Sequence, residues 1–350
     1  MNDRRMTSSL KNTKAAEYAF AVIIRTTGKR NDSLAEALQS VAFQHLKCLA
    51  VVVTHGTDTQ ILSEVDSVCK EINTLDYVLL HATDTHKKRG YPLNVGLDYC
   101  YNCGFTFDAI FFLDDDDIVY PFFTQKMRQA FDATDADVIY SASNQRHLGS
   151  QPEEAYRPKH ISYLFIENFI PINSYSVCFR SLKENNLLFD ESLEYTEDWH
   201  FLLRLLEKGL RFEALHETLS EFRMTSDGNA PVKQHPDIWK KASLEIRSYI
   251  NKTKFPVNGY VLASSVMSIN PRVPAQDAQI ISLQNQVSRL EAQIGQLTKE
   301  KGELEAELVC YHQLPKTFSE MIWIAFKAGF RRIRQMLVHM KTAFRGSSDT

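Results

Sequence analysis

Residues 109–117 read Ala-Ile-Phe-Phe-Leu-Asp-Asp-Asp-Asp, an apolar run that ends in four consecutive carboxylates. A short apolar run of this kind is typical of a central β-strand that is buried on both faces of an α/β sheet. Four adjacent carboxylates repel one another, so their position at the end of a buried strand indicates a cation, or a ligand that carries one. A solvated acidic loop is the alternative interpretation.

Further apolar runs alternate with helical patterns along the chain. The expected strands cover residues 18–25, 49–53, 77–80, 109–113, 137–141 and 175–180. Helical patterns lie between them, and Ser33 with Glu36 forms a capping-box signature at the first one. This alternation predicts an α/β fold with a mostly parallel sheet flanked by helices. Ligands bind such sheets beyond the carboxyl ends of the strands, where residues 114–117 lie.

The composition is that of an ordinary globular protein. The 350 residues are 44% hydrophobic and 24% charged, and the formal net charge is -3. This charge argues against bulk attraction to nucleic acid, so any basic surface must be local. The six cysteines have no framework spacing and are interpreted as reduced thiols. Cys100 and Cys103 have the C-x-x-C form, but they fall inside a predicted helix, which argues against a redox or zinc site.

The start of the sequence is polar. Residues 1–17 lack the apolar core of a signal peptide and predict a disordered tail before a catalytic domain at 18–270. No apolar run reaches the roughly 18 to 20 residues that a membrane-spanning helix needs. These observations predict a cytoplasmic protein.

A heptad pattern occupies residues 275–312. Apolar residues recur there at alternating steps of three and four, from Ile280 to Tyr311, with Lys301 at one a position. Isoleucine or valine at a and leucine at d favour a parallel two-stranded coiled coil, and hence a homo-oligomer. A helix that packs on the catalytic domain is the alternative.

Residues 316–345 predict a basic amphipathic helix. One face is apolar, and the remainder carries Lys327, Arg331, Arg332, Arg334, Lys341 and Arg345. This pattern is typical of a membrane-surface anchor, which predicts a peripheral location on the inner face of the cell membrane. A partner-binding helix and a part of an oligomer core are the alternatives.

A second acidic pair, Glu197 and Asp198, begins a helical pattern that Thr196 can cap and that Gly209 ends. The helix dipole favours carboxylates in a first turn, so simple helix-start acids are one interpretation. The other joins the two acidic sites: the 114–117 cluster holds a divalent metal on a diphosphate, and a separate carboxylate deprotonates an attacking hydroxyl. Hard oxygen ligands suit magnesium or manganese.

Four motifs in order resemble family 2 of the inverting glycosyltransferases, which have the GT-A fold. They are residues 22–30, residues 90–96 (GYPLNVG), residues 113–117, and residues 189–193 followed by Glu-Asp-Trp at 197–199. The resemblance covers roughly residues 20–224. It implies a metal-dependent enzyme, with Mn²⁺ or Mg²⁺, that moves a sugar from a nucleotide-sugar donor to a hydroxyl of a glycan or lipid-linked acceptor. Surface polysaccharide or glycolipid synthesis is the process that it implies.

The resemblance also implies roles for individual residues. The family's D-x-D metal motif falls on residues 114–116, with Asp116 as the direct metal ligand and Asp114 beside the ribose or a metal-bound water. Asp198 matches the general base. The implied nucleotide-sugar site consists of Thr26, Thr27, His55, Arg89, Gly90, Asn94, Asp114, Asp115 and Arg223, and the acceptor side of Glu197 and Trp199.

Two departures from the family pattern concern the donor and the metal. Where relatives commonly have paired aspartates after the second strand, this chain has Thr54-His55-Gly56, so the usual cue for uracil is missing. Many relatives also carry a histidine shortly after an arginine near the end of the catalytic domain. Here residues 222–225 read Phe-Arg-Met-Thr, so a third metal ligand is absent or comes from elsewhere.

Two other functions compete with a glycosyltransferase. A sugar-phosphate nucleotidyltransferase also places carboxylates and metal on an α/β sheet, but residues 25–30 offer a single glycine for its nucleotide loop. A catalytically inactive domain could serve as a membrane scaffold through the C-terminal segments. The presence of both Asp116 and Asp198 argues against the scaffold.

Overall fold

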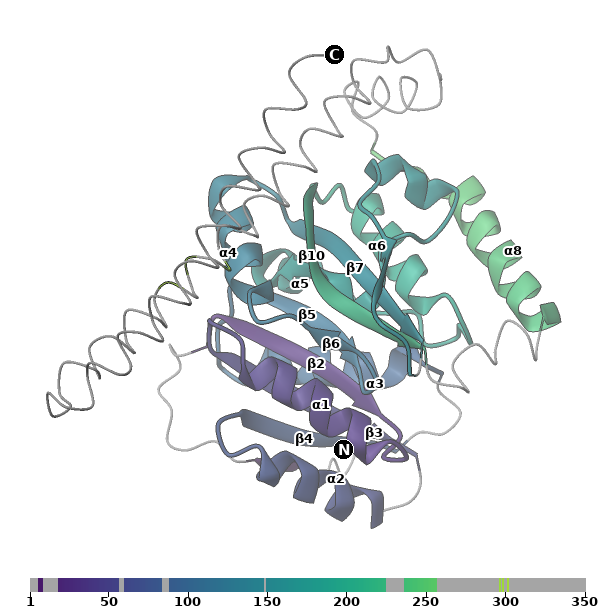
Figure 1. Ribbon diagram of the computed structural model, residues 1–350. Coiled ribbons are helices and arrows are strands. Elements are labelled where there is room, and N and C mark those ends of the chain that lie inside the picture. The colour runs from purple at the N-terminus through teal and green to yellow at the C-terminus, as the bar shows by residue number, and fades with distance from the viewer. Residues whose placement is uncertain are drawn as a thin grey trace, which may run out of the picture. The chain divides into compact units, whose positions relative to one another are not determined.

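The computed structural model describes residues 6–8, 18–56, 60–83, 88–147, 149–224, 236–256, 296, 298 and 301. The elements, most of them labelled in Figure 1, are β1 (Met6–Ser8), β2 (Phe20–Thr26), α1 (Asn31–Ala42), β3 (Cys48–His55), α2 (Gln60–Glu71), β4 (Asp76–Ala82), α3 (Gly90–Asn102), β5 (Ala109–Asp114), β6 (Ile118–Val119), α4 (Phe123–Ala133), β7 (Val138–His147), β8 (Glu153–Tyr156), η1 (Ile161–Phe165), η2 (Ile172–Ser174), β9 (Tyr175–Cys178), α5 (Phe179–Glu184), α6 (Glu197–Glu207), β10 (Phe212–Met224) and α8 (Pro236–Lys252).

One mixed sheet holds all the described strands, in the order β1-β4-β3-β2-β5-β9-β7-β10-β6, with β8 beside β7. The strands β4, β3, β2 and β5 are parallel, and so are β7 and β10. The strand β9 is antiparallel to both of its neighbours and joins the two parallel parts. The prediction of a mostly parallel α/β sheet flanked by helices is confirmed.

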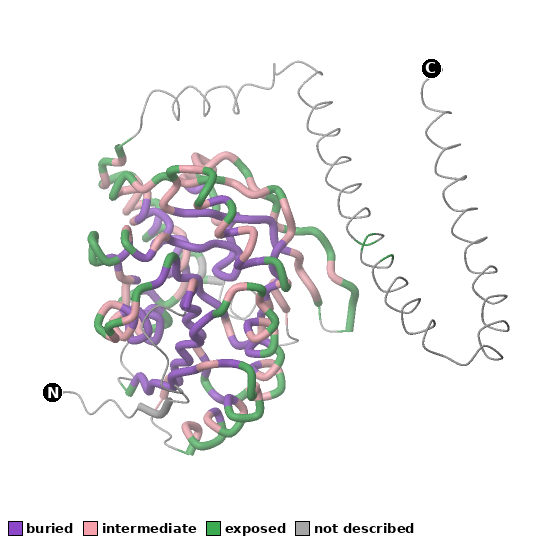
Figure 2. The backbone as a smooth tube through the Cα atoms, turned by 90° about the vertical axis from the view of Figure 1, so that its left-hand side faces the viewer, coloured by how far each residue is buried: buried purple, intermediate pink, exposed green. Residues whose placement is uncertain are grey.

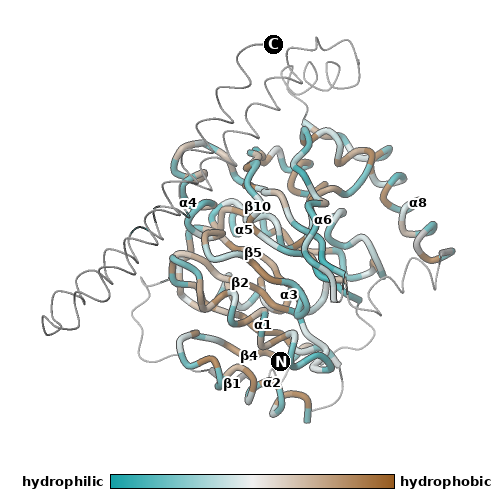
Figure 3. Tube along the Cα trace, viewed as in Figure 1, coloured by the Kyte–Doolittle hydropathy of each residue, from teal (hydrophilic) through white to brown (hydrophobic). Residues whose placement is uncertain are grey.

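Alternate residues of the central strands pack on opposite faces of the sheet. On one face Phe20, Val22 and Ile24 join the core under α1, α2 and α4. On the other, Ala21 and Ile23 join the core under α3, α5 and α6. Because both faces are covered, β2, β3 and β5 are continuously apolar up to their carboxyl ends rather than alternating. Figure 2 shows the buried strands inside an exposed shell, and Figure 3 shows the hydrophobic runs of β2 and β5.

The carboxyl ends of β2 and β5 meet at one edge of the sheet. Arg25 lies opposite Asp114 in their parallel register, and Thr26 lies opposite Thr54 of β3. The acidic residues that follow β5 therefore lie beside the ends of β2 and β3, as the strand pattern predicts.

The edge strand β1 differs from the sequence prediction. Residues 1–17 are predicted to be a disordered tail, whereas Met6–Ser8 pairs antiparallel with β4, Thr7 lying opposite Leu79. The outer edge of β4 offers unpaired backbone N–H and C=O groups, and a short strand satisfies them whatever its side chains are.

Several predicted boundaries shift. The predicted strand at 175–180 ends at Cys178, where α5 begins, and the strand predicted at 137–141 continues as β7 to His147. The capping box of Ser33 and Glu36 is wrong. The helix α1 begins at Asn31, ahead of Ser33, and the Glu36 carboxylate instead forms an ion pair with Arg223 of β10.

Thr196 precedes α6 but does not cap it through its side chain. Its φ is 65°, in the left-handed region, and its hydroxyl donates to the carbonyl of Tyr195 at 2.5 Å. The predicted stop is confirmed: Gly209 follows the helix with φ 73° and donates its N–H to Leu206. Cys100 and Cys103 are free thiols at the end of α3.

The chain divides into two compact units, Met1–Pro271 and Arg272–Thr350. The predicted coiled coil at 275–312 lies outside the described residues except for Gln296, Thr298 and Lys301, which are helical and exposed. The basic helix predicted at 316–345 lies entirely outside them. Within the described part, no helix is long and apolar enough to cross a membrane.

Candidate active site

Asp114 ends β5, and the guanidinium of Arg25 engages both of its carboxylate oxygens. The Nε of Arg25 lies 2.5 Å from Oδ1 of Asp114, and Nη2 lies 2.9 Å from Oδ2. Burial alone would raise the pKa of Asp114, but the charge and hydrogen bonds of Arg25 outweigh it and lower that pKa below its ordinary value. Asp114 is therefore a firmly ionised anion at the end of the strand.

A second arginine, Arg30, contacts the next two carboxylates of the turn. One of its terminal nitrogens pairs with Asp115 and the other with Asp116. Asp115 is buried and also accepts a hydrogen bond from Oγ1 of Thr26 at 2.6 Å. Desolvation and the negative charge of Asp114 raise the pKa of Asp116 to about 6, although Arg30 opposes the shift.

Asp117 is as deeply buried as Asp115, each being 1% exposed. Its Oδ1 accepts the backbone N–H of Arg223 at 2.8 Å, whereas its Oδ2 is buried without a hydrogen-bond partner in the described part of the chain. Burial, then repulsion by Asp116 and Asp114, raises the pKa of Asp117 well above its ordinary value. Burial and mutual repulsion therefore disfavour full ionisation of the turn, despite the nearby arginines.

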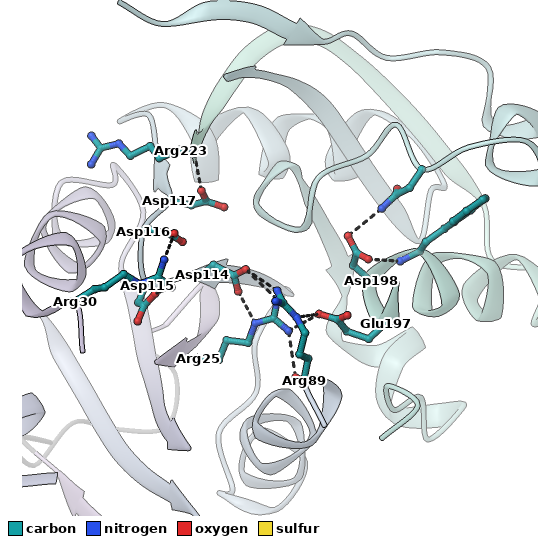
Figure 4. A network of polar contacts seen from close by, with 12 residues as sticks. Arg25, Arg30, Arg89, Asp114, Asp115, Asp116, Asp117, Glu197, Asp198 and Arg223 are labelled. Atoms are coloured by element: carbon teal, nitrogen blue, oxygen red, sulfur yellow. Dashed lines mark hydrogen bonds and ion pairs between the residues drawn. The ribbon is translucent and has the colours of Figure 1, made fainter. Parts of the chain in front are cut away.

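Glu197 opens α6 and is buried, with its side chain 3% exposed. Its Oε1 accepts from Nη1 of Arg25 at 2.6 Å and from Nε of Arg89 at 2.9 Å. Burial opposes ionisation, but the two guanidinium groups outweigh it and lower the pKa of Glu197. Figure 4 shows Arg25 and Arg89 between Glu197 and Asp114.

The next residue, Asp198, has a different environment. Its Oδ1 accepts the backbone N–H of Trp199 at 2.8 Å, and its Oδ2 accepts from Nδ2 of Asn168 at 2.9 Å. Desolvation, together with the adjacent charge of Glu197, raises the pKa of Asp198 to about 6. A carboxylate that titrates near neutral pH is a suitable general base.

Two residues implied for the nucleotide site, Asn94 and Gly90, contact the loop that leads to α6. The amide of Asn94 donates from Nδ2 to the carbonyl of Phe189 at 2.9 Å, and its Oδ1 accepts the N–H of Phe189 at 2.7 Å. Gly90 packs against the same loop, since a Cβ there would lie 2.9 Å from the carbonyl oxygen of Asp190. Both residues hold α3 against the segment that leads to α6.

The remaining implied residues lie at strand ends or inside the core. Thr27 is exposed after β2, and Trp199 is 7% exposed and donates its indole N–H to the carbonyl of Leu164 at 2.7 Å. His55 ends β3, edge-on to Tyr91 with ring centroids 6.2 Å apart. Its Nε2 is buried and lacks a hydrogen-bond partner among the described residues.

The side chain of Arg223 points away from the acidic turn in Figure 4. Its Nε donates to Glu221 at 2.8 Å, and Nη1 pairs with Glu36 of α1. Arg223 thus reaches Asp117 through its backbone N–H and not through its charge. A role for its guanidinium at a diphosphate stays a prediction.

Sequence reasoning did not assign a role to Arg25, Arg30 or Asn168. The two arginines did have a signal, since a charged residue at the end of a buried strand, and another shortly after it, require partners. Asn168 lies in an irregular stretch between η1 and η2, where the sequence shows no periodicity. Its contact with Asp198 could not be anticipated.

The carboxylates of the turn fit a divalent cation in their chemistry. Asp116 and the unpartnered Oδ2 of Asp117 are hard oxygen donors, and the pKa values of both residues are raised by burial and then by the negative charge of neighbouring aspartates. Asp114 is less available, because Arg25 occupies both of its oxygens. Within the described ranges no group of three or more His, Cys, Asp or Glu side chains is assembled as a metal site.

Neither a protein-family model nor a curated protein sequence matches this chain. Solved structures do: S. aureus TarS 1–349 in complex with UDP aligns with a TM-score of 0.51 and 18% identity, over 67% of this chain and 66% of that one. The mannosyltransferase PcManGT from Pyrobaculum calidifontis, in complex with GDP-Man and Mn²⁺, aligns with a TM-score of 0.51 and 13% identity, over 69% and 67%. The chain thus spans just under two thirds of the TarS fragment. At these identities the likeness concerns the fold, and the predicted GT-A type of α/β fold is confirmed.

Proposed function

We propose that the protein is a metal-dependent inverting glycosyltransferase that moves a sugar from a nucleotide-sugar donor to a hydroxyl acceptor. One observation carries this proposal: Arg25 hydrogen-bonds both Asp114 and Glu197, so the acidic turn and the base candidate Asp198 belong to one site. The two structures of similar fold hold UDP in one case and GDP-Man with Mn²⁺ in the other, which supports a nucleotide-sugar donor.

In the proposed reaction Asp198 accepts the proton of the acceptor hydroxyl. The hydroxyl oxygen forms a bond to the anomeric carbon as the bond from that carbon to the nucleoside diphosphate breaks, and the configuration inverts. Asn168 and the N–H of Trp199 hold one lone pair on each oxygen of Asp198, which fixes the carboxylate while leaving other lone pairs for the proton. General-base help of this kind contributes about 10² to 10⁴-fold.

The leaving diphosphate requires positive charge near the turn. Asp116, with Oδ2 of Asp117, would hold a divalent cation, which neutralises charge on the leaving group when it is bound. Arg30 lies on Asp115 and Asp116 and is partly exposed, so its guanidinium also stands where it can meet a phosphate. Thr27 and His55, at the ends of neighbouring strands, are proposed to line the nucleoside part of the site.

The purified chain offers a direct test of the activity. With MnCl₂ present, we expect the release of UDP from UDP-GlcNAc or of GDP from GDP-mannose, and Asp198→Asn should reduce it about 10² to 10⁴-fold. Asp132→Asn is the matched control, because Asp132 forms an exposed pair with Arg128 on α4 and should not change the rate. Full activity in Asp198→Asn would refute the base assignment, and an inactive wild type would favour a scaffold.

Metal binding has a readout of its own. Addition of MnCl₂ should raise the thermal unfolding midpoint of the wild-type chain, because a ligand that binds the folded state stabilises it. The shift should disappear in Asp116→Asn and persist in Asp132→Asn. An equal shift in the two variants would exclude Asp116 as a ligand.

We also propose that the basic segment at 316–345 anchors the enzyme to anionic membrane and that the heptads at 275–312 make it oligomeric. This arrangement suits the synthesis of surface polysaccharide or glycolipid. The full chain should sediment with vesicles that contain anionic lipid, and a triple change of Arg331, Arg332 and Arg334 to Gln should weaken this binding. Equal binding of both forms would contradict the anchor.

A further inference from the structure

Arg25 connects three parts of the chain that are distant in sequence. Its Nε and Nη2 engage Asp114, 89 residues away, and its Nη1 lies 2.6 Å from Oε1 of Glu197, 172 residues away. The same Nη1 also donates to the carbonyl of Arg89 at 3.1 Å. Every nitrogen of the guanidinium is therefore engaged, which fixes its position between the end of β5 and the start of α6 (Figure 4).

Arg89 shares the partners of Arg25 but is held less firmly. Its side chain is 46% exposed, against 11% for Arg25, and among the described residues it hydrogen-bonds Glu197 alone, with Asp114 at 3.7 Å. A bidentate and buried arginine positions its partners more strictly than an exposed one does. Arg25 is thus the residue that sets the distance between the two acidic groups.

The start of α6 depends on such a restraint. Thr196, directly before the helix, has φ 65°, which a threonine rarely adopts, and its side chain does not cap the helix. An unusual backbone conformation persists where surrounding contacts determine it. The ion pairs of Glu197 with Arg25 and Arg89 provide these contacts one residue later.

We infer that Arg25 is a positioning residue that holds Glu197, and with it the neighbouring Asp198, in register with Asp114 at the end of β5. The inference rests on the proposed function, because it gives Asp198 the role of base. Arg25 does not touch the reacting atoms in this account. It keeps the base at a fixed separation from the turn that meets the diphosphate.

The charges around Asp198 determine how the loss of Arg25 would change the pKa of Asp198. The groups that influence Asp198 are Glu197 on α6, the backbone N–H of Trp199, Arg25 on β2, Arg89 before α3, Tyr156 on β8, Tyr175 on β9 and the amide of Asn168. Glu197 disfavours the ionised form of Asp198, while Arg25 and Arg89 favour it. Without Arg25 the pKa of Asp198 must rise, because the charge of Glu197 is then less compensated.

Activity against pH tests the inference in Arg25→Gln and Arg25→Lys, with UDP-GlcNAc or GDP-mannose and MnCl₂ as probes. The acidic limb of kcat should move up by about one pH unit in Arg25→Gln. Arg25→Lys keeps the positive charge but not the bidentate geometry of the guanidinium. The acidic limb of kcat should therefore stay in place in this variant while kcat falls. Arg180→Gln, an exposed pair with Glu184 on α5, is the control and should match the wild type. An unmoved limb in Arg25→Gln would overturn the inference.

A second measurement needs no activity. In chemical unfolding, Arg25→Gln should destabilise the chain more at pH 8 than at pH 5, because Asp198, whose pKa is about 6 and whose charge Arg25 helps to compensate, is largely protonated at the lower pH. In the double variant Arg25→Gln with Asp198→Asn, part of this pH dependence should vanish. That result would show coupling between Arg25 and Asp198. Strict additivity of the two substitutions would refute the link, even if the wild type transfers no sugar. An inactive wild type with clear coupling would refute the proposed function alone.

Discussion

The acidic turn after β5 and the first turn of α6 each combine a paired anion with a less compensated one. Asp114 and Glu197 bind arginine through short hydrogen bonds, and their pKa values are lowered. Asp116 and Asp198, two residues and one residue further on, have pKa values raised to about 6. The difference shows that neighbouring carboxylates can have separate roles. Asp114 and Glu197 hold the structure together, whereas Asp116 and Asp198 are available for chemistry.

The largest effect is expected where the structural partner is removed. Glu197→Gln removes one of the two anions that Arg25 and Arg89 share, Asp114 being the other. Breaking a buried ion pair such as that of Arg25 with Glu197 costs roughly 3 to 5 kcal/mol. Chemical unfolding at pH 7 would measure this loss in the free energy of unfolding. Asp198→Asn is the comparison and should cost far less, since Asp198 has no arginine partner among the described hydrogen bonds. Equal losses in the two variants would remove the distinction between them.

Asn168 should give a smaller effect that combines stability with activity. Asn168→Ala leaves Oδ2 of Asp198 without its donor, and an unsatisfied polar group costs about 1 to 3 kcal/mol. We expect kcat to fall more than KM changes, because a base that is free to rotate is less often aligned with its hydroxyl. Asn168→Asp would add a negative charge beside Asp198 and should move the acidic limb of kcat to higher pH. A limb that stays in place would place Asn168 outside the site.

The sequence predicts the sheet and the acidic residues at its edge far better than it predicts which side chains contact those acidic residues. The strands β2, β3 and β5 are apolar up to their carboxyl ends because both faces are covered, so their positions and the carboxylates at the end of β5 can be predicted. The sequence of the four-residue strand β9 does not indicate whether it pairs parallel or antiparallel, because its antiparallel pairing depends on tertiary contacts. The partners of Arg25 lie 89 and 172 residues away, and no local pattern indicates them.

The two C-terminal predictions rest on patterns within single segments. Heptads and a basic amphipathic face are periodic patterns within one segment, and they indicate a helix without naming what it packs against. The coiled coil at 275–312 and the basic helix at 316–345 therefore stay predictions, and their partners are not indicated. The buried runs of β2 and β5, by contrast, indicate neighbouring strands in a sheet that is covered on both faces.

Raised and lowered pKa values also predict opposite responses to pH. The pKa of Asp198 is about 6 in the folded chain, above the ordinary value of 3.8, so the folded state binds the proton more tightly than the unfolded state does. Stability from this group is present at low pH and declines as the pH rises through about 6. The stability of Asp198→Asn relative to wild type should therefore rise by about 2 to 3 kcal/mol between pH 4 and pH 8. A constant difference across this range would mean that Asp198 titrates normally.

The smallest effect is expected for an ion pair outside both regions. Arg128 on α4 pairs with Asp132 at 3.0 Å and also with Asp108, and the side chains of Arg128, Asp132 and Asp108 are 40%, 63% and 44% exposed. Exposed pairs four residues apart on a helix contribute about 0.3 to 0.5 kcal/mol and are screened by salt. Arg128→Gln should thus lower the free energy of unfolding by less than about 0.5 kcal/mol, with no change in the pH dependence of kcat. Arg25 and Arg128 carry the same charge, so a large effect for the first beside a negligible one for the second would show that burial and shared partners, not charge alone, give an arginine its influence. Similar small effects at both positions would mean that the ion pairs of Arg25 contribute no more than a surface pair.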